Sequence, residues 1–184
     1  MNTWTAPVDY YHEFLTNPDK ALSYFSNLDW EERTKARREL FYATVNEPYT
    51  YGSGEHARTY IPKPMDTMVN EIGVAISNML GLKSYELCFM NYYENEKQHL
   101  GWHADDAEAI DHTRPIAVVS VGAIRQLWTR PIEGGPEDIE RFALNHGSLL
   151  VMKPGMQHTH YHKIPKGDRP SGPRISLTYR GYNQ

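Results

Sequence analysis

Two histidine-containing segments, far apart in the chain, carry residue types that bind metal ions. His103 and Asp105 are separated by one residue, so on an extended segment both side chains leave the same face and can bind one ion. Downstream, three histidines alternate with other residues, at His158, His160 and His162. One of them would complete a set of two histidines and one carboxylate, which leaves the remaining coordination positions of the metal open. The residues themselves leave open which histidine completes the set, and whether the metal is iron or zinc.

The segment from Pro173 to Arg180 supplies a binding group for an acid. Arg174 and Arg180 lie six residues apart, so on a strand their side chains project to one face. A buried guanidinium is well suited to bidentate binding of a carboxylate. Two such arginines beside a metal with open positions predict an iron centre that takes a dicarboxylate cosubstrate.

The elements that must position these residues divide the chain into a helical part and a β-rich part. Asn17-Pro18-Asp19 is a typical helix opening, and apolar residues spaced by three and four from Pro64 predict a second helix that ends at Gly81. The charged run from Trp30 to Leu40 indicates a solvated surface. Runs rich in Val, Ile, Leu and Tyr predict strands over residues 86–93, 115–128, 147–152 and 174–182. Helices followed by short strands favour an α+β fold, in which helices back a barrel or jelly roll.

Composition and charge narrow the class of protein. A chain of 184 residues with 40% hydrophobic and 23% charged residues is typical of one globular domain. The net charge of −4 argues against tight nonspecific adhesion to nucleic acid, but it is compatible with a local basic groove. No apolar run approaches the length of a membrane span, so we expect neither export nor membrane insertion. The single cysteine, Cys88, cannot form an internal disulfide, which fits a reducing, intracellular compartment.

Several segments together resemble, in the same order, the AlkB family of iron(II)- and 2-oxoglutarate-dependent dealkylating dioxygenases. The segments are 90–93 (Met-Asn-Tyr-Tyr), 101–106 (Gly-Trp-His-Ala-Asp-Asp), 119–123, 145–152 and 173–180. The resemblance covers the chain from about Tyr49 onward, and the combination is more specific than any one motif. It implies one dioxygenase domain over residues 1–184 with a double-stranded β-helix, or jelly-roll, core and the N-terminal helices packed on one face. Residues 1–85 would supply helical support and a nucleotide-recognition loop, and residues 86–184 the catalytic core.

The resemblance also implies roles for individual residues. His103, Asp105 and His162 would bind iron. We choose His162 because Gln157-x-x-x-x-His162-x-Ile164-Pro165 fits the family's pattern for its second histidine, with His160 as the runner-up. The residues expected to bind 2-oxoglutarate are Asn91, Tyr93, Arg174, Ser176 and Arg180. The residues expected near an extruded base are Tyr49 and Tyr51, on the aromatic segment 48–54, together with Asp106 and Arg125.

By this resemblance the chain would carry out oxidative dealkylation of N-alkylated nucleobases with Fe(II), 2-oxoglutarate and O2. Its partner would be alkylated single-stranded DNA or RNA, with duplex as a further form, and we expect a monomer in the cytoplasm, or in the nucleus of a eukaryote. Three features depart from the family. His160 stands where many relatives have Trp, Ser176 where Asn is frequent, and a short segment before His103 implies a reduced nucleotide-recognition lid. A hydroxylase of a protein or small metabolite, and a catalytically silent metal-binding module, are the alternatives.

Overall fold

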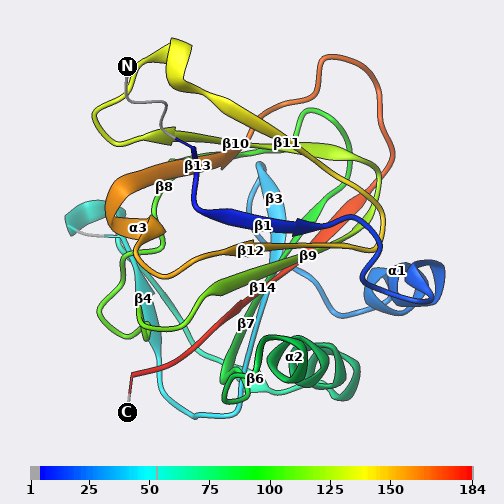
Figure 1. Cartoon of the computed structure of the whole chain (residues 1–184). Helices are drawn as coiled ribbons and strands as arrows, with labels where there is room; N and C mark the ends of the chain where they lie inside the picture. Colours follow the sequence, from blue (N-terminus) through cyan, green and yellow to red (C-terminus); the bar gives the residue numbers. More distant parts are fainter. Residues whose placement is uncertain (1–4, 53, 184) are drawn as a thin grey trace.

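The computed structural model describes residues 5–52 and 54–183, and its strands form two facing sheets and a short hairpin (Figure 1). The large sheet has the order β1-β12-β9-β14-β7-β3-β2, with β6 paired to β3. Its strands are β1 (Val8–Tyr11), β2 (Glu31–Thr34), β3 (Arg37–Ala43), β6 (Lys63–Pro64), β7 (Leu87–Tyr93), β9 (Ile116–Gly122), β12 (Ser148–Met152) and β14 (Arg174–Arg180). The predicted α+β fold with a jelly-roll core is therefore confirmed.

The small sheet lies over the inner face of the large one and has the order β11-β10-β13-β8. Its strands are β8 (Leu100–His103), β10 (Arg125–Pro131), β11 (Glu140–Leu144) and β13 (His160–Ile164). The hairpin consists of β4 (Tyr49–Tyr51) and β5 (Arg58–Tyr60). One-turn elements are the 3-10 helices η1 (Gly54–His56) and η2 (Pro136–Asp138) and the helix α3 (Met156–Thr159). Residues 86–184, the predicted catalytic core, thus supply all strands of the small sheet.

Two helices cover the outer face of the large sheet (Figure 1). α1 (Pro18–Ser26) begins as predicted, because the Asn17 side chain accepts a hydrogen bond from the backbone of Lys20 (3.1 Å). α2 (Thr67–Leu80) begins three residues later than the predicted Pro64, because Asp66 caps it by accepting from Val69 N. It ends at Gly81, whose positive φ of 67° suits glycine. None of the helices in the described part of the chain has the length and apolar composition that crossing a bilayer requires.

Strand alternation in β14 separates the hydrophobic core from a polar interior. Ile175, Leu177 and Tyr179 point outward and pack with α1 and α2 in one buried cluster. Arg174 and Arg180, of opposite parity, point inward between the two sheets and are also buried, at 0% and 8% exposed. The same seven-residue strand therefore anchors the helices and supplies the cations of the interior.

Residues 1–85 contain more β-structure than the predicted helical support. Within the described residues they supply β1, β2, β3 and β6 to the large sheet as well as both strands of the hairpin. The prediction that residues 30–40 form a solvated surface is wrong for β3, where Glu39 is 1% exposed. Arg37 and Glu39 are two residues apart on the strand, so their side chains lie on the same face. They form an ion pair (Nη2 to Oε1, 2.8 Å).

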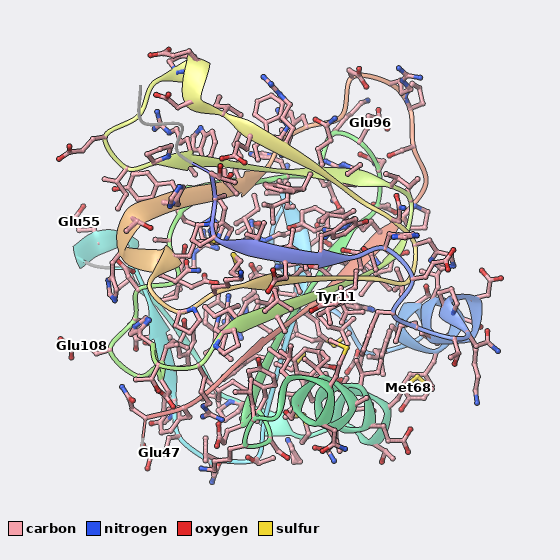
Figure 2. The ribbon with its side chains drawn as sticks, in the orientation of Figure 1. Tyr11, Glu47, Glu55, Met68, Glu96 and Glu108 are labelled. Carbon is pink, nitrogen blue, oxygen red and sulfur yellow. The ribbon has the colours of Figure 1, made fainter. Side chains whose placement is uncertain are left out.

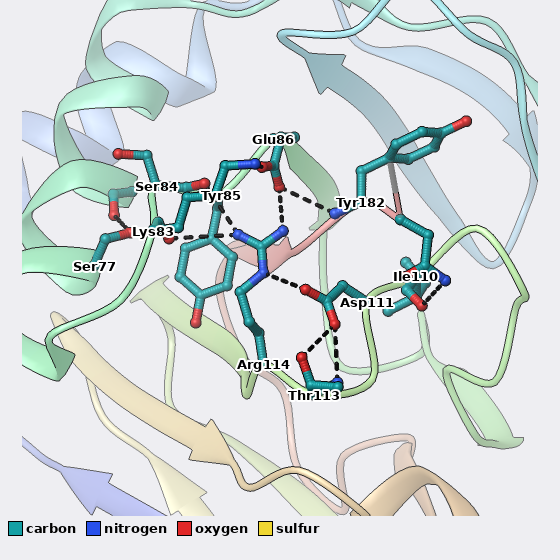
Figure 3. Close-up of polar contacts among 12 residues, drawn as sticks. Ser77, Lys83, Ser84, Tyr85, Glu86, Ile110, Asp111, Thr113, Arg114 and Tyr182 are labelled. Carbon is teal, nitrogen blue, oxygen red and sulfur yellow. Dashed lines mark hydrogen bonds and ion pairs between the residues drawn. The ribbon is translucent and has the colours of Figure 1, made fainter.

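A buried ion cluster around Arg114 ties the C-terminal segment to the start of β7 (Figure 3). The Arg114 guanidinium donates to the carboxylates of Glu86 and Asp111, and the side chains of Arg114 and Glu86 are 9% and 7% exposed. Glu86 also accepts a hydrogen bond from the backbone of Tyr182 (3.0 Å). Because Tyr182 follows β14 and Asp111 lies on the segment after β8, the cluster fixes two segments that lead away from the interior cations and from Asp105.

Replacing Arg114 by methionine leaves Glu86 without its buried guanidinium partner, so we expect the free energy of unfolding to fall by about 3 kcal/mol. Lys83→Met is the matched control, because it removes the other cation of Glu86 from a side chain that is 60% exposed, and its effect should stay under about 1 kcal/mol. Urea denaturation followed by circular dichroism measures both. Equal losses for the two variants would contradict the role given to Arg114.

Candidate metal centre

The structure brings His103, Asp105 and His162 together on the inner face of the small sheet. One ligand atom from each lies within 4.8 Å of the other two. His103 ends β8 and is the register partner of His162 in β13, and their ring centroids are 4.1 Å apart. His160 begins β13 and is not part of the group; its Nδ1 lies 2.8 Å from the Thr159 hydroxyl. Strand pairing therefore selects His162 from the three alternating histidines.

The three side chains fit a ferrous ion by their chemistry and by the atoms they leave free. His103 Nδ1 lies 2.8 Å from the Gly101 carbonyl, an arrangement in which Nδ1 donates and Nε2 offers its lone pair to a metal. Asp105 Oδ1 is buried, lies 3.6 Å from His103 Nε2, and accepts no hydrogen bond within the described residues. Two imidazoles and one carboxylate on one side of an ion are the donor set of iron oxygenases that keep other positions open.

Arg180 holds the third ligand in its ionised form. Its Nη2 and Nε donate to Asp105 Oδ2 at 2.8 and 3.2 Å, and the aspartate is 1% exposed. Burial alone would raise the pKa of Asp105, but Arg180 and the two histidines outweigh it and hold that pKa well below its usual range. The backbone N–H of Asp105 donates to Gln157 Oε1 (2.8 Å), which fixes the residue from a second side.

Burial keeps both histidines neutral. Removal from water, followed by the nearby His103, lowers the pKa of His162 to about 3, and burial likewise lowers the pKa of His103. The attraction of Asp105 opposes the shift in both rings without cancelling it. A metal ligand must be unprotonated, so this environment prepares both imidazoles for coordination near neutral pH.

One cavity beside the metal group is suited to an acid. Its walls include Asn91, Tyr93, Arg174 and Ser176, all four of which were predicted to bind 2-oxoglutarate. Arg174 is fully buried and donates only to the Ser120 hydroxyl (2.8 Å), so that Nε and Nη1 have no partner among the described residues. Burial lowers its pKa to about 10, which leaves it a cation at neutral pH. A buried cation with free donors calls for an anion.

The two predicted clamp arginines therefore differ in what their donors do. Arg180 lines the same cavity, but its Nε and Nη2 already donate to Asp105. Arg174 keeps two nitrogen atoms, Nε and Nη1, without a partner among the described residues. The separation along β14 that puts both on one face also puts one at the metal and the other at the far end of the cavity.

A second cavity, lined by aromatic rings, shares His103 and Asp105 with the first. The predicted residues Tyr49 and Tyr51 both belong to it, and the Tyr51 ring lies edge-on to His103 at 6.0 Å between centroids. The other aromatic side chains of this cavity are Tyr60 and Phe89. Because Tyr49 is 2% exposed, it both packs in the core and forms the cavity wall.

Sequence reasoning missed a cation in the wall of this aromatic cavity, together with its acidic partner. Arg37 lines it, donates from Nε to Asn91 Oδ1 (3.1 Å), and pairs with Glu39, which also accepts from Tyr60 Oη (3.1 Å). The signal was present as Arg-x-Glu with a period of two, directly before an apolar run. Reading the whole charged run as surface hid it.

Neither Arg125 nor Asp106 lines either of the two cavities. Arg125 lines neither of them, because its buried guanidinium donates to three backbone carbonyls, those of Asn95, Gln98 and Pro165. The structure therefore does not bring Arg125 to the cavities that contain the other predicted site residues, and its guanidinium supports three loops instead. Asp106 is exposed directly after the buried Asp105. Ser53, within the predicted aromatic segment 48–54, lies outside the described residues.

The buried neutral histidines predict how the stability of the metal-free protein depends on pH. Since His162 has a pKa of about 3 when folded and about 6.5 when unfolded, its contribution is complete above pH 6.5 and is lost as the pH falls toward 3. At pH 5.5 the loss amounts to about 1 kcal/mol for this residue.

Urea unfolding of the chelator-treated protein at pH 7.5 and 5.5 measures this dependence. We expect His162→Asn to lose that part of it, whereas His12→Asn, at an exposed position, keeps it. Identical pH dependence in His162→Asn and the unsubstituted protein would count against the buried neutral ring.

Comparison with known proteins agrees with this geometry. Residues 9–180 match the family model of the 2OG-Fe(II) oxygenase superfamily. The chain is 28% identical over 165 residues to the alpha-ketoglutarate-dependent dioxygenase alkB homolog 3 of Bos taurus, which covers 84% of this chain and 57% of that protein. It is 29% identical over 150 residues to the DNA oxidative demethylase ALKBH2 of Mus musculus, which covers 78% of this chain and 61% of that protein. The chain thus spans about three fifths of the length of these curated relatives.

The fold is also shared with a solved structure. OsALKBH1 superposes with a TM-score of 0.68 at 14% identity, over 97% of this chain and 98% of that chain. The resemblance to the AlkB family predicted from the sequence is confirmed by the two curated relatives, and OsALKBH1 shares the fold. Since the family model covers both metal-binding segments and β14, the chain belongs to the 2OG-Fe(II) oxygenase superfamily.

Proposed function

We propose that the chain is an Fe(II)- and 2-oxoglutarate-dependent dioxygenase that removes N-alkyl groups from nucleobases of DNA or RNA. The observation that supports this function is the aromatic cavity, whose walls include His103 and Asp105 of the metal group. A flat ring held between tyrosines would present its alkyl group to the metal. Names of the relatives, a DNA oxidative demethylase among them, support the same substrate class.

The residues of the chain divide the work around the ion. His103, Asp105 and His162 would hold Fe(II), and Arg174 would receive the distal carboxylate of 2-oxoglutarate beside Tyr93 and Ser176. When bound, Fe(II) would supply the oxidation in which one oxygen atom of O2 enters a C–H bond of the N-alkyl group and the other enters 2-oxoglutarate, which becomes succinate and CO2. The hydroxylated carbon would then leave as an aldehyde, and the base would be restored. Arg180 keeps Asp105 ionised, and the surrounding burial excludes water.

Substrate selection would rest on the aromatic cavity and its rim. Tyr49 and Tyr51 would stack on an extruded base, a contact that contributes about 1 to 3 kcal/mol per base. Asp106, exposed beside the metal ligand, would meet the positive charge that alkylation gives to a base. Extrusion is easiest from a single strand, so we propose single-stranded DNA or RNA as the preferred form. We also propose that the chain acts as one domain and as a monomer within the cell.

Removing a metal ligand tests the oxidation. We expect His103→Ala and Asp105→Ala to abolish succinate production from 2-oxoglutarate, because two ligands cannot hold the ion in place. Formaldehyde release from an N-methylated oligonucleotide should disappear in the same variants. Normal succinate production by either variant would refute the assignment of the metal site.

The choice of substrate also separates this function from its rivals. Formaldehyde or hydroxylated product from peptides, with none from methylated oligonucleotides, would indicate a protein hydroxylase. Absence of iron-dependent succinate in the unsubstituted chain would indicate a silent metal-binding module.

Arg174 provides a prediction about the cosubstrate. Arg174→Gln should raise the KM for 2-oxoglutarate by about 10- to 100-fold, since a charge-assisted hydrogen bond to a carboxylate contributes about 1.5 to 3 kcal/mol. Ser120→Ala is the matched control, because it removes the partner that Arg174 already has and leaves the free N–H groups in place. Initial rates of succinate release measure both. An unchanged KM in Arg174→Gln would exclude Arg174 as the acid receptor.

A further inference from the structure

A row of alternating cations and indoles crosses the outer face of the small sheet. Lys163 Nζ lies 4.9 Å from the ring centre of Trp102 and 4.8 Å from that of Trp128. The guanidinium of Arg141 lies 4.7 Å from Trp128, and that of Arg130 lies 4.9 Å from Trp102. We call these five residues the cation–indole ladder.

Strand register builds the ladder from four different strands. Trp128 of β10 is the register partner of Lys163 in β13 and of Arg141 in β11, and Trp102 lies on β8. At about 4.8 Å between neighbouring strands, the row from Trp102 to Arg141 spans about 14 Å. It therefore crosses the whole width of the small sheet.

The ladder faces away from the metal centre but begins beside it. Trp102 and Lys163 directly adjoin His103 and His162 in the sequence, and neighbouring side chains on a strand point to opposite faces. Trp128 is likewise partly exposed next to the fully buried Thr129. A bound polymer that leaves the metal cavities and passes round the edge strand β8 would reach the ladder.

The cations of the ladder are not neutralised by acids. Within residues 5–52 and 54–183, no carboxylate oxygen lies within 4.0 Å of a charged nitrogen of Lys163, Arg130 or Arg141. Among the described residues, Arg130 donates only to the Gly134 carbonyl (3.2 Å). In a chain with a net charge of −4, three cations without carboxylate partners on one face form a local basic strip.

A groove of about 450 Å³ continues the ladder past Trp128. Gln126 and Trp128 form one wall, and Lys166 and Arg169 stand on the segment that follows β13. Arg169 is paired with Asp168 at 3.6 Å, and Glu96, labelled in Figure 2, accepts a hydrogen bond from the backbone of Ser171. Among the described residues Lys166 has no carboxylate within 4.0 Å, so the groove adds one unpaired cation next to Trp128.

We propose that the ladder and this groove bind the backbone and bases of single-stranded nucleic acid next to the target base. The proposal rests on the proposed function and extends it to the flanking nucleotides. Cations alone would suit any polyanion, but cations interleaved with aromatic rings suit an unpaired strand, whose phosphates pair with the cations and whose bases stack on the rings. In a duplex the base faces are covered, so the indoles would have no partner.

Fluorescence anisotropy with a labelled, unmethylated oligodeoxythymidine of about 12 nucleotides tests the proposal. Trp128→Ala should raise the Kd by about 10-fold, and Trp128→Phe should restore most of the affinity because it retains a ring. Lys163→Gln should reduce the slope of log Kd against log salt by about 0.7, the value for one phosphate contact in a single strand.

Lys20→Gln on α1 is the matched control, because it removes one exposed cation at a position outside the small sheet and should leave Kd and slope unchanged. Equal unfolding midpoints establish that the variants are folded. Unchanged affinity in Trp128→Ala, or equal slopes for Lys163→Gln and Lys20→Gln, would overturn the proposal. Displacement of the oligonucleotide by polyglutamate at equal charge concentration would also overturn it, in favour of an acidic protein partner.

Turnover distinguishes failure of the ladder from failure of the proposed function. On an N-methylated oligonucleotide, Trp128→Ala should raise KM by about the same 10-fold, while KM for an N-methylated mononucleotide stays unchanged. Equal effects on both substrates would mean that Trp128 acts by supporting the metal cavity. That result would overturn the ladder proposal and leave the dealkylase proposal intact. Absence of demethylation in the unsubstituted chain would refute the dealkylase, and the binding experiment would still decide the ladder.

Discussion

The ion pair between Arg180 and Asp105 is the interaction on which the metal centre depends. A carboxylate that is 1% exposed needs a charged partner to remain ionised, and Arg180 provides one at 2.8 Å while Oδ1 stays free on the side of the histidines. The pair also joins β14 of the large sheet to the segment after β8 of the small sheet. The same ion pair therefore links the two sheets and keeps the metal-binding carboxylate ionised.

The alternation of outward apolar and inward charged side chains along β14 explains how the fold tolerates this buried pair. The outward residues of that strand bury themselves against α1 and α2, and the hydrophobic contribution from that face offsets the cost of placing two arginines inside. Arg180 is compensated by Asp105, whereas Nε and Nη1 of Arg174 at the other end have no partner in the described part of the chain. The cavity thus has an arginine paired with a carboxylate at the metal end and an arginine with unpartnered nitrogens at the far end, which is where the cosubstrate acid is proposed to lie.

Local patterns predicted much of this from the sequence. His103-x-Asp105 and the two arginines of β14 follow from a period of two along single strands, and both helices follow from caps and spacing. Contacts across strands were not readable in this way. Arg37 meets Asn91 because β3 pairs with β7, and the ladder joins positions 102, 128, 141 and 163 from four strands. The prediction that residues 30–40 form a solvated surface was wrong for β3. A run of mixed charges is typical of a surface, and the sequence does not show which of these charges pair with each other in the interior.

The most direct test of the central claim is anaerobic titration of the protein with 2-oxoglutarate in the presence and absence of Fe(II), followed by calorimetry. If the three ligands hold an ion with open positions beside Arg174, Fe(II) should strengthen binding of one 2-oxoglutarate per chain, and His162→Ala should remove that strengthening. Equal affinity with and without Fe(II), or an unchanged response in His162→Ala, would contradict the account.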